Sequence, residues 1–171
     1  MLISEEYREL NKKLHLSNPS YGGAERPQTA AMLLAVSKQL KTQDILDYGS
    51  GKGSIAMALP FSIKEYDPAV EGKEATPEPA DIVYCGDVLE HIEPECLEAV
   101  LDDLKRVTKV LGVFSVCCIP ALKVLEDGRN AHLIVKSPYW WADKVYEKFQ
   151  IKGLKVLGDH NSVQIVVTPK V

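Results

Sequence analysis

Three glycines within five positions constrain the backbone more tightly than any other stretch of the sequence. The segment ILDYGSGKGSIAMALP covers residues 45–60, and its Gly49, Gly51 and Gly53 separate two apolar runs. Glycine inside regular structure costs about 0.5–1 kcal/mol relative to alanine, so such a cluster indicates a backbone that turns sharply and lies close to something else. We therefore predict a buried strand, a glycine turn and a short helix, in that order.

Strand and helix patterns alternate along the rest of the chain, which is typical of an α/β protein with a mainly parallel sheet. Apolar runs predict strands over 44–48, 61–67, 81–86 and 113–120, and residues 154–169 predict a terminal hairpin that turns near 159–162. Helical spacing predicts helices over 3–15, 27–40, 92–112 and 139–149, with a short one from Ser54. In the helix over 92–112, Leu111 completes the apolar face and Gly112 marks the end. The hairpin predicts an antiparallel strand at the C-terminal side of the sheet.

The composition is that of one globular domain covering residues 1–171. Hydrophobic residues make up 46% and charged residues 26% of the chain, which is ordinary for such a domain. No apolar run approaches the roughly 20 residues that a membrane-spanning helix needs. The first ten residues, MLISEEYREL, lack the basic and apolar regions of a secretory signal, so a cytoplasmic location is expected.

Charge is unevenly distributed along the sequence. Residues 65–103 hold thirteen acids and one base, a local charge of −12, whereas residues 121–156 hold seven bases and four acids, a local charge of +3. The acidic block argues against binding of long nucleic acid, while the basic segment can meet a single phosphate or carboxylate. Solvated faces account for these counts equally well. We expect a small-molecule or exposed-group substrate and no membrane partner, and the patterns leave the oligomeric state open.

Neither the cysteines nor the acidic motif after residue 89 predicts a metal site. The four cysteines form no CxxC pair, and most of them lie in apolar, strand-like runs, so we interpret them as reduced thiols: Cys85, Cys96, Cys117 and Cys118. The motif EHIEPE offers three glutamates and a histidine within residues 90–95. Its proline and the start of the following helix separate these side chains, so no metal is predicted there.

The glycine turn fails two nucleotide-binding patterns. The phosphate-binding pattern GxxxxGK[ST] requires a hydroxyl residue after Lys52, where Gly53 stands, and a first glycine where Leu46 stands. The dinucleotide pattern GxGxxG matches Gly49 and Gly51, but Ser54 occupies the place of the third glycine or alanine. Neither pattern therefore identifies the ligand of the glycine turn.

The combination of three motifs resembles the class I S-adenosylmethionine (SAM)-dependent methyltransferases. The segment LDYGSGKG resembles their first motif, D/E-x-G-x-G-x-G, with Asp47 as the acid. Asp67 follows twenty residues later (67 − 47), where the family places an acid that accepts hydrogen bonds from both ribose hydroxyls. The segment DIVYCGDVLEHI, residues 81–92, resembles the family's fourth-strand motif. The resemblance covers roughly residues 25–120.

This resemblance implies a Rossmann-like fold with SAM as the cofactor. SAM carries a cationic sulfonium and an ammonium, which suit an acid beside the loop and an acidic rim. The matching motifs place the cofactor-binding set in three segments: Asp47, Tyr48, Gly49, Ser50, Gly51 and Gly53; Tyr66, Asp67 and Pro68; Gly86, Asp87 and Val88. The helices within residues 1–40 are expected to cover the cofactor side.

The chain departs from the family between the second strand and the fourth-strand motif. Only thirteen residues, 68–80, lie there, too few for the usual helix and third strand. We therefore predict that the third strand is missing, which leaves a six-stranded core. The resemblance then implies that adenine contacts come from residues 69–80 or from Gly86 and Asp87.

Candidate catalytic residues follow the fourth-strand motif and the last predicted parallel strand. Glu90 and His91 can act as bases, although Glu90 can instead cap the backbone and His91 can simply pack. The loop over 121–138 is a candidate substrate loop, in which Arg129 can pair with an anion and His132 can orient or deprotonate the nucleophile. A plain turn at Asp127–Gly128 explains part of this loop equally well.

Three functions remain open from the sequence. The first is SAM-dependent methylation of an O or N nucleophile on a small substrate. The second is a non-catalytic SAM-binding or regulatory module. The third is a methyltransferase that modifies a nucleotide or a nucleic-acid base.

Overall fold

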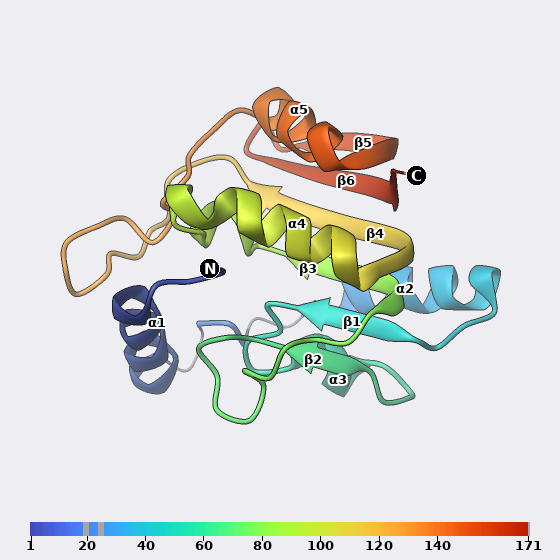
Figure 1. Ribbon diagram of the computed structural model, residues 1–171, viewed down its shortest axis with the longest axis horizontal. Coiled ribbons are helices and arrows are strands. Elements are labelled where there is room, and N and C mark those ends of the chain that lie inside the picture. The colour runs from blue at the N-terminus through green and yellow to red at the C-terminus, as the bar shows by residue number, and fades with distance from the viewer. Residues whose placement is uncertain (19–20, 24–25, 171) are drawn as a thin grey trace.

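The computed structural model describes residues 1–18, 21–23 and 26–170, which form a six-stranded sheet with helices on both faces (Figure 1). The helices are α1 Glu5–Ser17, α2 Pro27–Leu40, α3 Ser54–Ala58, α4 Leu97–Val107 and α5 Pro138–Lys148, with 3₁₀ turns at Leu89–His91 and Pro94–Cys96. The strands are β1 Ile45–Tyr48, β2 Lys64–Tyr66, β3 Ala80–Gly86, β4 Thr108–Cys117, β5 Phe149–Leu157 and β6 Ser162–Pro169. No helix in the described part of the chain is long and apolar enough to cross a membrane.

The strand order is β2-β1-β3-β4-β6-β5. Strands β1 to β4 pair in parallel, and β6 is antiparallel to both β4 and β5. This confirms the predicted α/β fold with a mainly parallel sheet and an antiparallel C-terminal strand. Strand β2 forms one edge, and residues 68–79 contain no strand, so the prediction of a missing third strand is also confirmed.

Each face of the sheet buries its own apolar cluster. Helices α4 and α5 cover one face, where Leu101 and Trp141 belong to a cluster with Val83 and Cys85 of β3. Helices α2 and α3 contribute to the cluster on the other face, which contains Ile82 and Tyr84 of the same strand. The alternation along β3 is that of a central strand buried on both sides.

The prediction of one helix over 92–112 is wrong at both ends. A 3₁₀ turn precedes α4, which stops at Val107, and β4 begins at the next residue, earlier than the predicted 113. Leu111 and Gly112 lie inside β4, opposite Ile82 and Val83 of β3. Pairing with the central strand overrides the helical spacing that Leu111 continues, and the Thr108 hydroxyl donates to the Leu104 carbonyl where the helix ends (2.7 Å).

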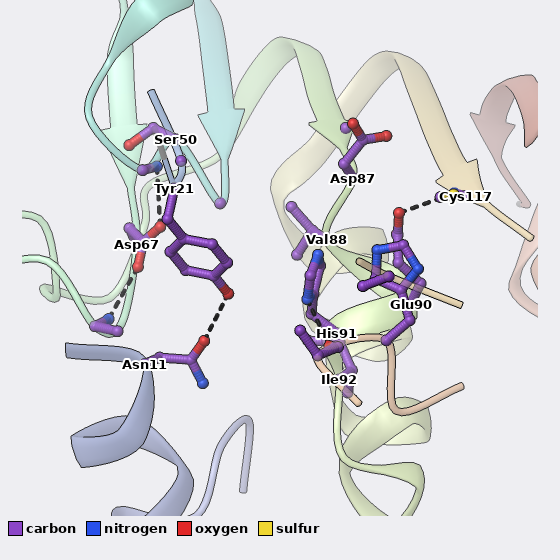
Figure 2. A pocket seen from close by; sticks show the side chains of 18 of the residues that line it. Asn11, Tyr21, Ser50, Asp67, Asp87, Val88, Glu90, His91, Ile92 and Cys117 are labelled. Carbon is purple, nitrogen blue, oxygen red and sulfur yellow. Dashed lines mark hydrogen bonds between the residues drawn. The ribbon is translucent and has the colours of Figure 1, made fainter. Parts of the chain in front are cut away.

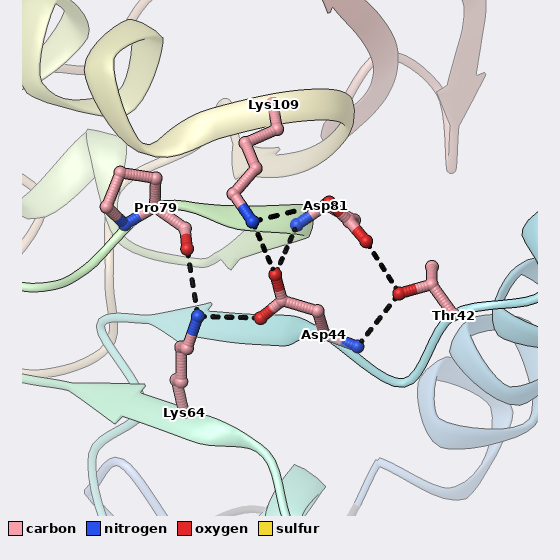
Figure 3. A network of polar contacts seen from close by, with 6 residues as sticks. All are labelled: Thr42, Asp44, Lys64, Pro79, Asp81 and Lys109. Carbon is pink, nitrogen blue, oxygen red and sulfur yellow. Dashed lines mark hydrogen bonds and ion pairs between the residues drawn. The ribbon is translucent and has the colours of Figure 1, made fainter.

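A polar network joins four strands at their end away from the glycine turn (Figure 3). The Asp44 carboxylate, just before β1, accepts from Lys64 of β2 at 2.6 Å and from Lys109 of β4 at 2.7 Å, so it connects these strands. Thr42 donates to Asp81 at 2.7 Å, and Lys64 also donates to the Pro79 carbonyl. The network therefore ties the short edge strand β2 to the centre of the sheet.

We expect Asp44→Asn to lower the melting temperature at low salt, because it weakens both ammonium contacts of the network. The deficit should shrink at high salt, since exposed ion pairs are screened. Thermal melting at two salt concentrations measures both effects. The control is Glu147→Gln, whose Lys144 partner lies on the same helix and joins no strands. Equal deficits for the two variants would contradict this role for Asp44.

Candidate functional site

A cavity of about 510 Å³ lies at the carboxyl ends of the parallel strands. Its lining comes from α1 and Tyr21, Gly22 and Arg26, from the glycine turn, from residues 67–69 and 84–92, and from the segment after β4. In Figure 2, Asp67 and Tyr21 lie on one side of the cavity, and Glu90, His91 and Cys117 lie on the other. We call the first side the glycine-loop end, with Gly49, Gly51 and Asp67, and the second the histidine end, with Glu90, His91 and His132.

Gly51 is held where no side chain fits. Its φ is +51°, and a Cβ added there would lie 2.5 Å from the carbonyl oxygen of Gly22. Its amide donates to Asp67 Oδ2 at 2.9 Å, and its carbonyl accepts from Lys73 Nζ at 2.9 Å. The close backbone approach explains the glycine, and the two hydrogen bonds fix the loop from the direction of β2.

Asp67 lies at the end of β2 and is buried, with 7% of its surface exposed. Besides the Gly51 amide, its carboxylate accepts from the amide of Ala69 at 2.9 Å. Each oxygen thus has one backbone donor and retains acceptor capacity toward the cavity. The carboxylate can therefore hold the loop and accept hydrogen bonds from a bound diol.

Charged side chains also line the cavity. Arg26 and Asp87 form an ion pair of 2.7 Å. Asp87 adopts a left-handed φ of +55°, and its amide donates to the Ser115 carbonyl, so its position is fixed by the neighbouring strand. Burial, followed by the charge of Glu65, raises the pKa of Asp47 to about 7. These acids and Arg26 suit a ligand that carries both an amine and a carboxylate.

The two histidines of the histidine end are oriented by backbone carbonyls. Nδ1 of His91 lies 2.7 Å from the Ala131 oxygen, and Nδ1 of His132 lies 2.6 Å from the Ile119 oxygen. Because a carbonyl only accepts, each Nδ1 carries a proton, and in the neutral ring the lone pair is then on Nε2. The rings meet edge to face, with centroids 4.7 Å apart. Burial, followed by His132, lowers the pKa of His91 to about 4, so this imidazole is neutral at pH 7.

Glu90 is completely buried beside these histidines. Its Oε1 accepts from the Cys117 amide at 2.8 Å, which links the 3₁₀ turn after β3 to the end of β4. Its Oε2 has no partner among the described residues. Burial, followed by the charge of Asp87, raises the pKa of Glu90 to about 8.

The cavity brings together most of the side chains and loop positions predicted from the sequence. Those that line it are Asp47, Gly49, Ser50, Gly51, Asp67, Pro68, Gly86, Asp87, Val88, Glu90, His91 and His132. Four others are not part of its lining: Tyr48, Gly53, Tyr66 and Arg129.

These four lie elsewhere for identifiable reasons. Tyr48 points to the opposite face of the sheet, where its hydroxyl donates to Asp103 at 2.9 Å. Tyr66 packs against it and supports the glycine turn only through its carbonyl, which accepts the amide of Gly49 at 2.7 Å. Gly53 starts α3. Arg129 pairs with Asp127 at 2.6 Å, outside the cavity.

Residues 1–40 were predicted to cover the cofactor side, but their individual lining residues were not predicted, because nothing local marks them. Tyr21 donates to Asn11 of α1 at 2.9 Å, and the Tyr7 hydroxyl donates to the His91 carbonyl at 2.7 Å. Helix α1 also shares an apolar cluster with Leu125 and Ala131 of the loop after β4. The N-terminal helix and the 121–138 loop therefore meet over the histidine end. The one available signal for Arg26 was its place before the helix-starting Pro27.

Solved structures with this fold are numerous, although no protein-family model and no curated protein sequence matches the chain. The 1,6-didemethyltoxoflavin-N1-methyltransferase of Burkholderia thailandensis, solved with S-adenosylhomocysteine, aligns over 100% of this chain and 92% of its own, with TM-score 0.70 and 13% identity. The DhpI–SAH complex aligns over 97% and 98%, with TM-score 0.66 and 14% identity. Magnesium protoporphyrin IX methyltransferase of Synechocystis PCC 6803, with bound SAM, aligns over 98% and 99%, with TM-score 0.57 and 16% identity.

At these identities the likeness shows the fold alone. The chain has the Rossmann-like fold of class I methyltransferases, shortened between β2 and β3.

Proposed function

We propose that this protein is a SAM-dependent methyltransferase that acts on an O or N nucleophile of a small molecule. The observation that carries the proposal is a single cavity with two chemically distinct ends. The glycine-loop end offers a tight backbone turn, a buried carboxylate and an Arg–Asp pair, and the histidine end offers two imidazoles with free Nε2 lone pairs. Three solved structures with this fold support the cofactor assignment, because each contains SAM or S-adenosylhomocysteine (SAH).

The residues at the glycine-loop end fit the parts of SAM. Asp67 would accept from the ribose hydroxyls, and Gly49 and Gly51 would let the backbone lie against the methionine portion. Arg26 would bind the carboxylate, and the acids Asp47 and Asp87 would bind the ammonium. Adenine would lie against Pro68 and Ala69, which follow the edge strand β2, and against Gly86 and Val88 at the end of β3. Bound SAM supplies an activated methyl group, and the protein supplies alignment.

The histidine end receives the acceptor. His91 Nε2 takes the proton that an O–H or N–H nucleophile releases, since its Nδ1–H is fixed on the Ala131 carbonyl. Among the earlier candidates, His132 and Glu90 complete the wall of this end, and Arg129 acts from outside by holding the 121–138 loop. Tyr7, Ile92 and Ile119 give the same end an apolar lining that fits a small, partly apolar acceptor. A cytoplasmic location and the absence of long nucleic acid as partner belong to this proposal.

We expect Asp67→Asn to weaken SAM binding by roughly 10- to 100-fold, because a charged hydrogen bond contributes about 1.5–3 kcal/mol. Isothermal calorimetry with SAM measures the affinity. Asparagine keeps one acceptor and the shape of the side chain, which limits the loss of loop structure. Glu71→Gln, an exposed acid of the same segment, is the control and should bind normally. Unchanged affinity in Asp67→Asn would reject this ribose placement.

The enzyme is distinguished from a non-catalytic SAM-binding module by label transfer. Protein, methyl-labelled SAM and a fractionated small-molecule cell extract are incubated together, and the products are separated. Labelled product in a small-molecule fraction supports the proposal. SAM binding without transfer to any fraction favours the regulatory module, and transfer to nucleotides favours the third function.

A further inference from the structure

Three side chains from three segments converge at the histidine end. Glu90 comes from the 3₁₀ turn after β3, Cys117 from the last position of β4, and His132 from the 121–138 loop. One ligand atom from each, a carboxylate oxygen, the thiol sulfur and a ring nitrogen, lie within 4.8 Å of one another. All three residues line the cavity. Cys117 has no role in the function proposed above.

The Glu90 carboxyl lacks a partner for its second oxygen. Oε1 accepts the Cys117 amide, which fixes the carboxyl plane, and Oε2 is buried with no hydrogen-bond partner in the described part of the chain. Ionised Glu90 leaves an uncompensated charge, and protonated Glu90 leaves a donor without an acceptor. Burying an unpartnered group of either kind costs folding free energy, so we expect Oε2 to bind a partner from outside the chain.

The chemistry of the neighbours identifies that partner. The Nδ1 proton of His132 is directed at the Ile119 carbonyl, which leaves a lone pair on Nε2. The Cys117 thiol contacts the same Ile119 carbonyl, at 3.8 Å, and its sulfur becomes an electron-pair donor when a bound cation displaces the thiol proton. Three lone-pair donors of different type therefore meet at one place, and a single hydrogen-bond donor cannot satisfy all of them. A cation can.

We propose that Glu90, Cys117 and His132 form a divalent metal site, and that its preferred ion is Zn²⁺. Mixed sulfur, nitrogen and oxygen ligands suit zinc rather than magnesium or calcium, and three protein ligands with one open position are typical of catalytic zinc. The outer contacts are also those of a metal site, because the Ile119 carbonyl orients His132 and the Cys117 amide orients Glu90. The sequence did not predict it, since the three ligands lie far apart in the chain.

This inference rests on the proposed function in one respect. The open position faces the cavity that receives the acceptor, so the metal would bind the nucleophilic atom of the acceptor and orient it toward the methyl group. The acceptor is then a small molecule whose nucleophile is itself a metal ligand. The O–H or N–H proton of the acceptor passes to His91 Nε2, the new bond to the methyl carbon forms, and the electron pair of the broken carbon–sulfur bond stays on sulfur.

The test uses the full chain, freed of metal by dialysis against a chelator and titrated with Zn²⁺ or Co²⁺ in the absence of SAM. We expect one ion per chain and, with Co²⁺, a thiolate charge-transfer absorption together with the visible bands of tetrahedral coordination. Cys117→Ser should lose the charge-transfer band. Glu90→Gln and His132→Ala should weaken Zn²⁺ binding at least about tenfold, as expected for the loss of one ligand.

Cys118→Ser is the matched control. Its thiol is the next in sequence, is buried away from the cavity and lies 3.8 Å from the Val116 carbonyl, so the variant should keep the spectrum. No bound ion, a band that survives Cys117→Ser, or equal loss in Cys118→Ser would overturn the inference. SAM affinity is measured on the same metal-free protein. Normal SAM binding without a metal leaves the proposed function standing, whereas Zn²⁺ binding without SAM binding removes the proposed function alone.

Discussion

Alanine in place of Gly51 is expected to weaken SAM binding by more than about 100-fold and to lower the melting temperature. A non-glycine residue in the left-handed region costs roughly 1–2 kcal/mol. The added Cβ would also lie 2.5 Å from the Gly22 carbonyl oxygen, so one of the two backbone segments must move. Both the Asp67 and Lys73 contacts depend on the position of Gly51. A displaced Asp67 would lose its charged hydrogen bonds to the two ribose hydroxyls, and two such bonds at about 1.5 kcal/mol each correspond to roughly 100-fold in affinity.

Gly128→Ala separates the backbone cost from the clash. Gly128 has a φ of +88° and open space around its missing Cβ, and it does not line the cavity. This variant should lose only the stability that a non-glycine residue costs in the left-handed region. It should keep full SAM affinity. Calorimetry and thermal melting on both variants make the comparison. Normal SAM binding by Gly51→Ala would show that the turn does not contact the cofactor.

The glycine-loop end was predictable because its determinants are local. Asp47 and the three glycines belong to one strand-to-helix turn, and such a turn in an α/β protein is encoded by a few consecutive residues. The missing third strand was predictable for a similar reason, since thirteen residues cannot form a crossover. What the spacing could not indicate is that Lys73, from that short connection, donates to the carbonyl of Gly51.

The sequence-based predictions are wrong where contacts with a segment far away in the chain determine the structure. The stretch after Val107 continues a helical pattern through Leu111, yet it pairs with β3 and β6 and becomes a strand. The histidine end could not be predicted for the same reason, because its residues come from segments far apart in the chain. Cys117 and Glu90 are joined only because β3 and β4 are neighbours, and His132 joins them through a loop fixed by the Ile119 and Ala131 carbonyls. The periodicity of apolar residues carries no information on contacts between distant segments.

The loop after β4 also shows why residue type alone misplaces a site. Arg129 and His132 are three positions apart and equally polar, so the sequence treats them alike. The Arg129 guanidinium pairs with Asp127 and lies over the Tyr7 ring, 5.5 Å from its centroid, whereas His132 lines the cavity. Of the two residues, only His132 lines the cavity, so only His132 can contact an acceptor bound there.

We expect His91→Asn to lower methyl transfer by about 10²–10⁴-fold while leaving SAM affinity and melting temperature nearly unchanged. The asparagine amide nitrogen replaces Nδ1 and can still donate to the Ala131 carbonyl, so the structural contact of the imidazole is kept. What is lost is Nε2, the one atom of this ring that can accept a proton from the acceptor. Label transfer from SAM to an acceptor fraction that the unaltered protein methylates measures the rate.

Two further variants distinguish a catalytic role of His91 from a structural one. Arg129→Ala should keep its rate of transfer, because its side chain lies outside the cavity, and it should lose only some stability with the Asp127 pair. His91→Ala removes both the proton acceptor and the contact to Ala131, so it should be as slow as His91→Asn and should melt earlier. If His91→Asn transfers methyl groups at the original rate while His91→Ala melts early, His91 is a structural residue that joins the 3₁₀ turn to the 121–138 loop. The proton of the acceptor then leaves by another route, and the nucleophile is one that needs no base at this position.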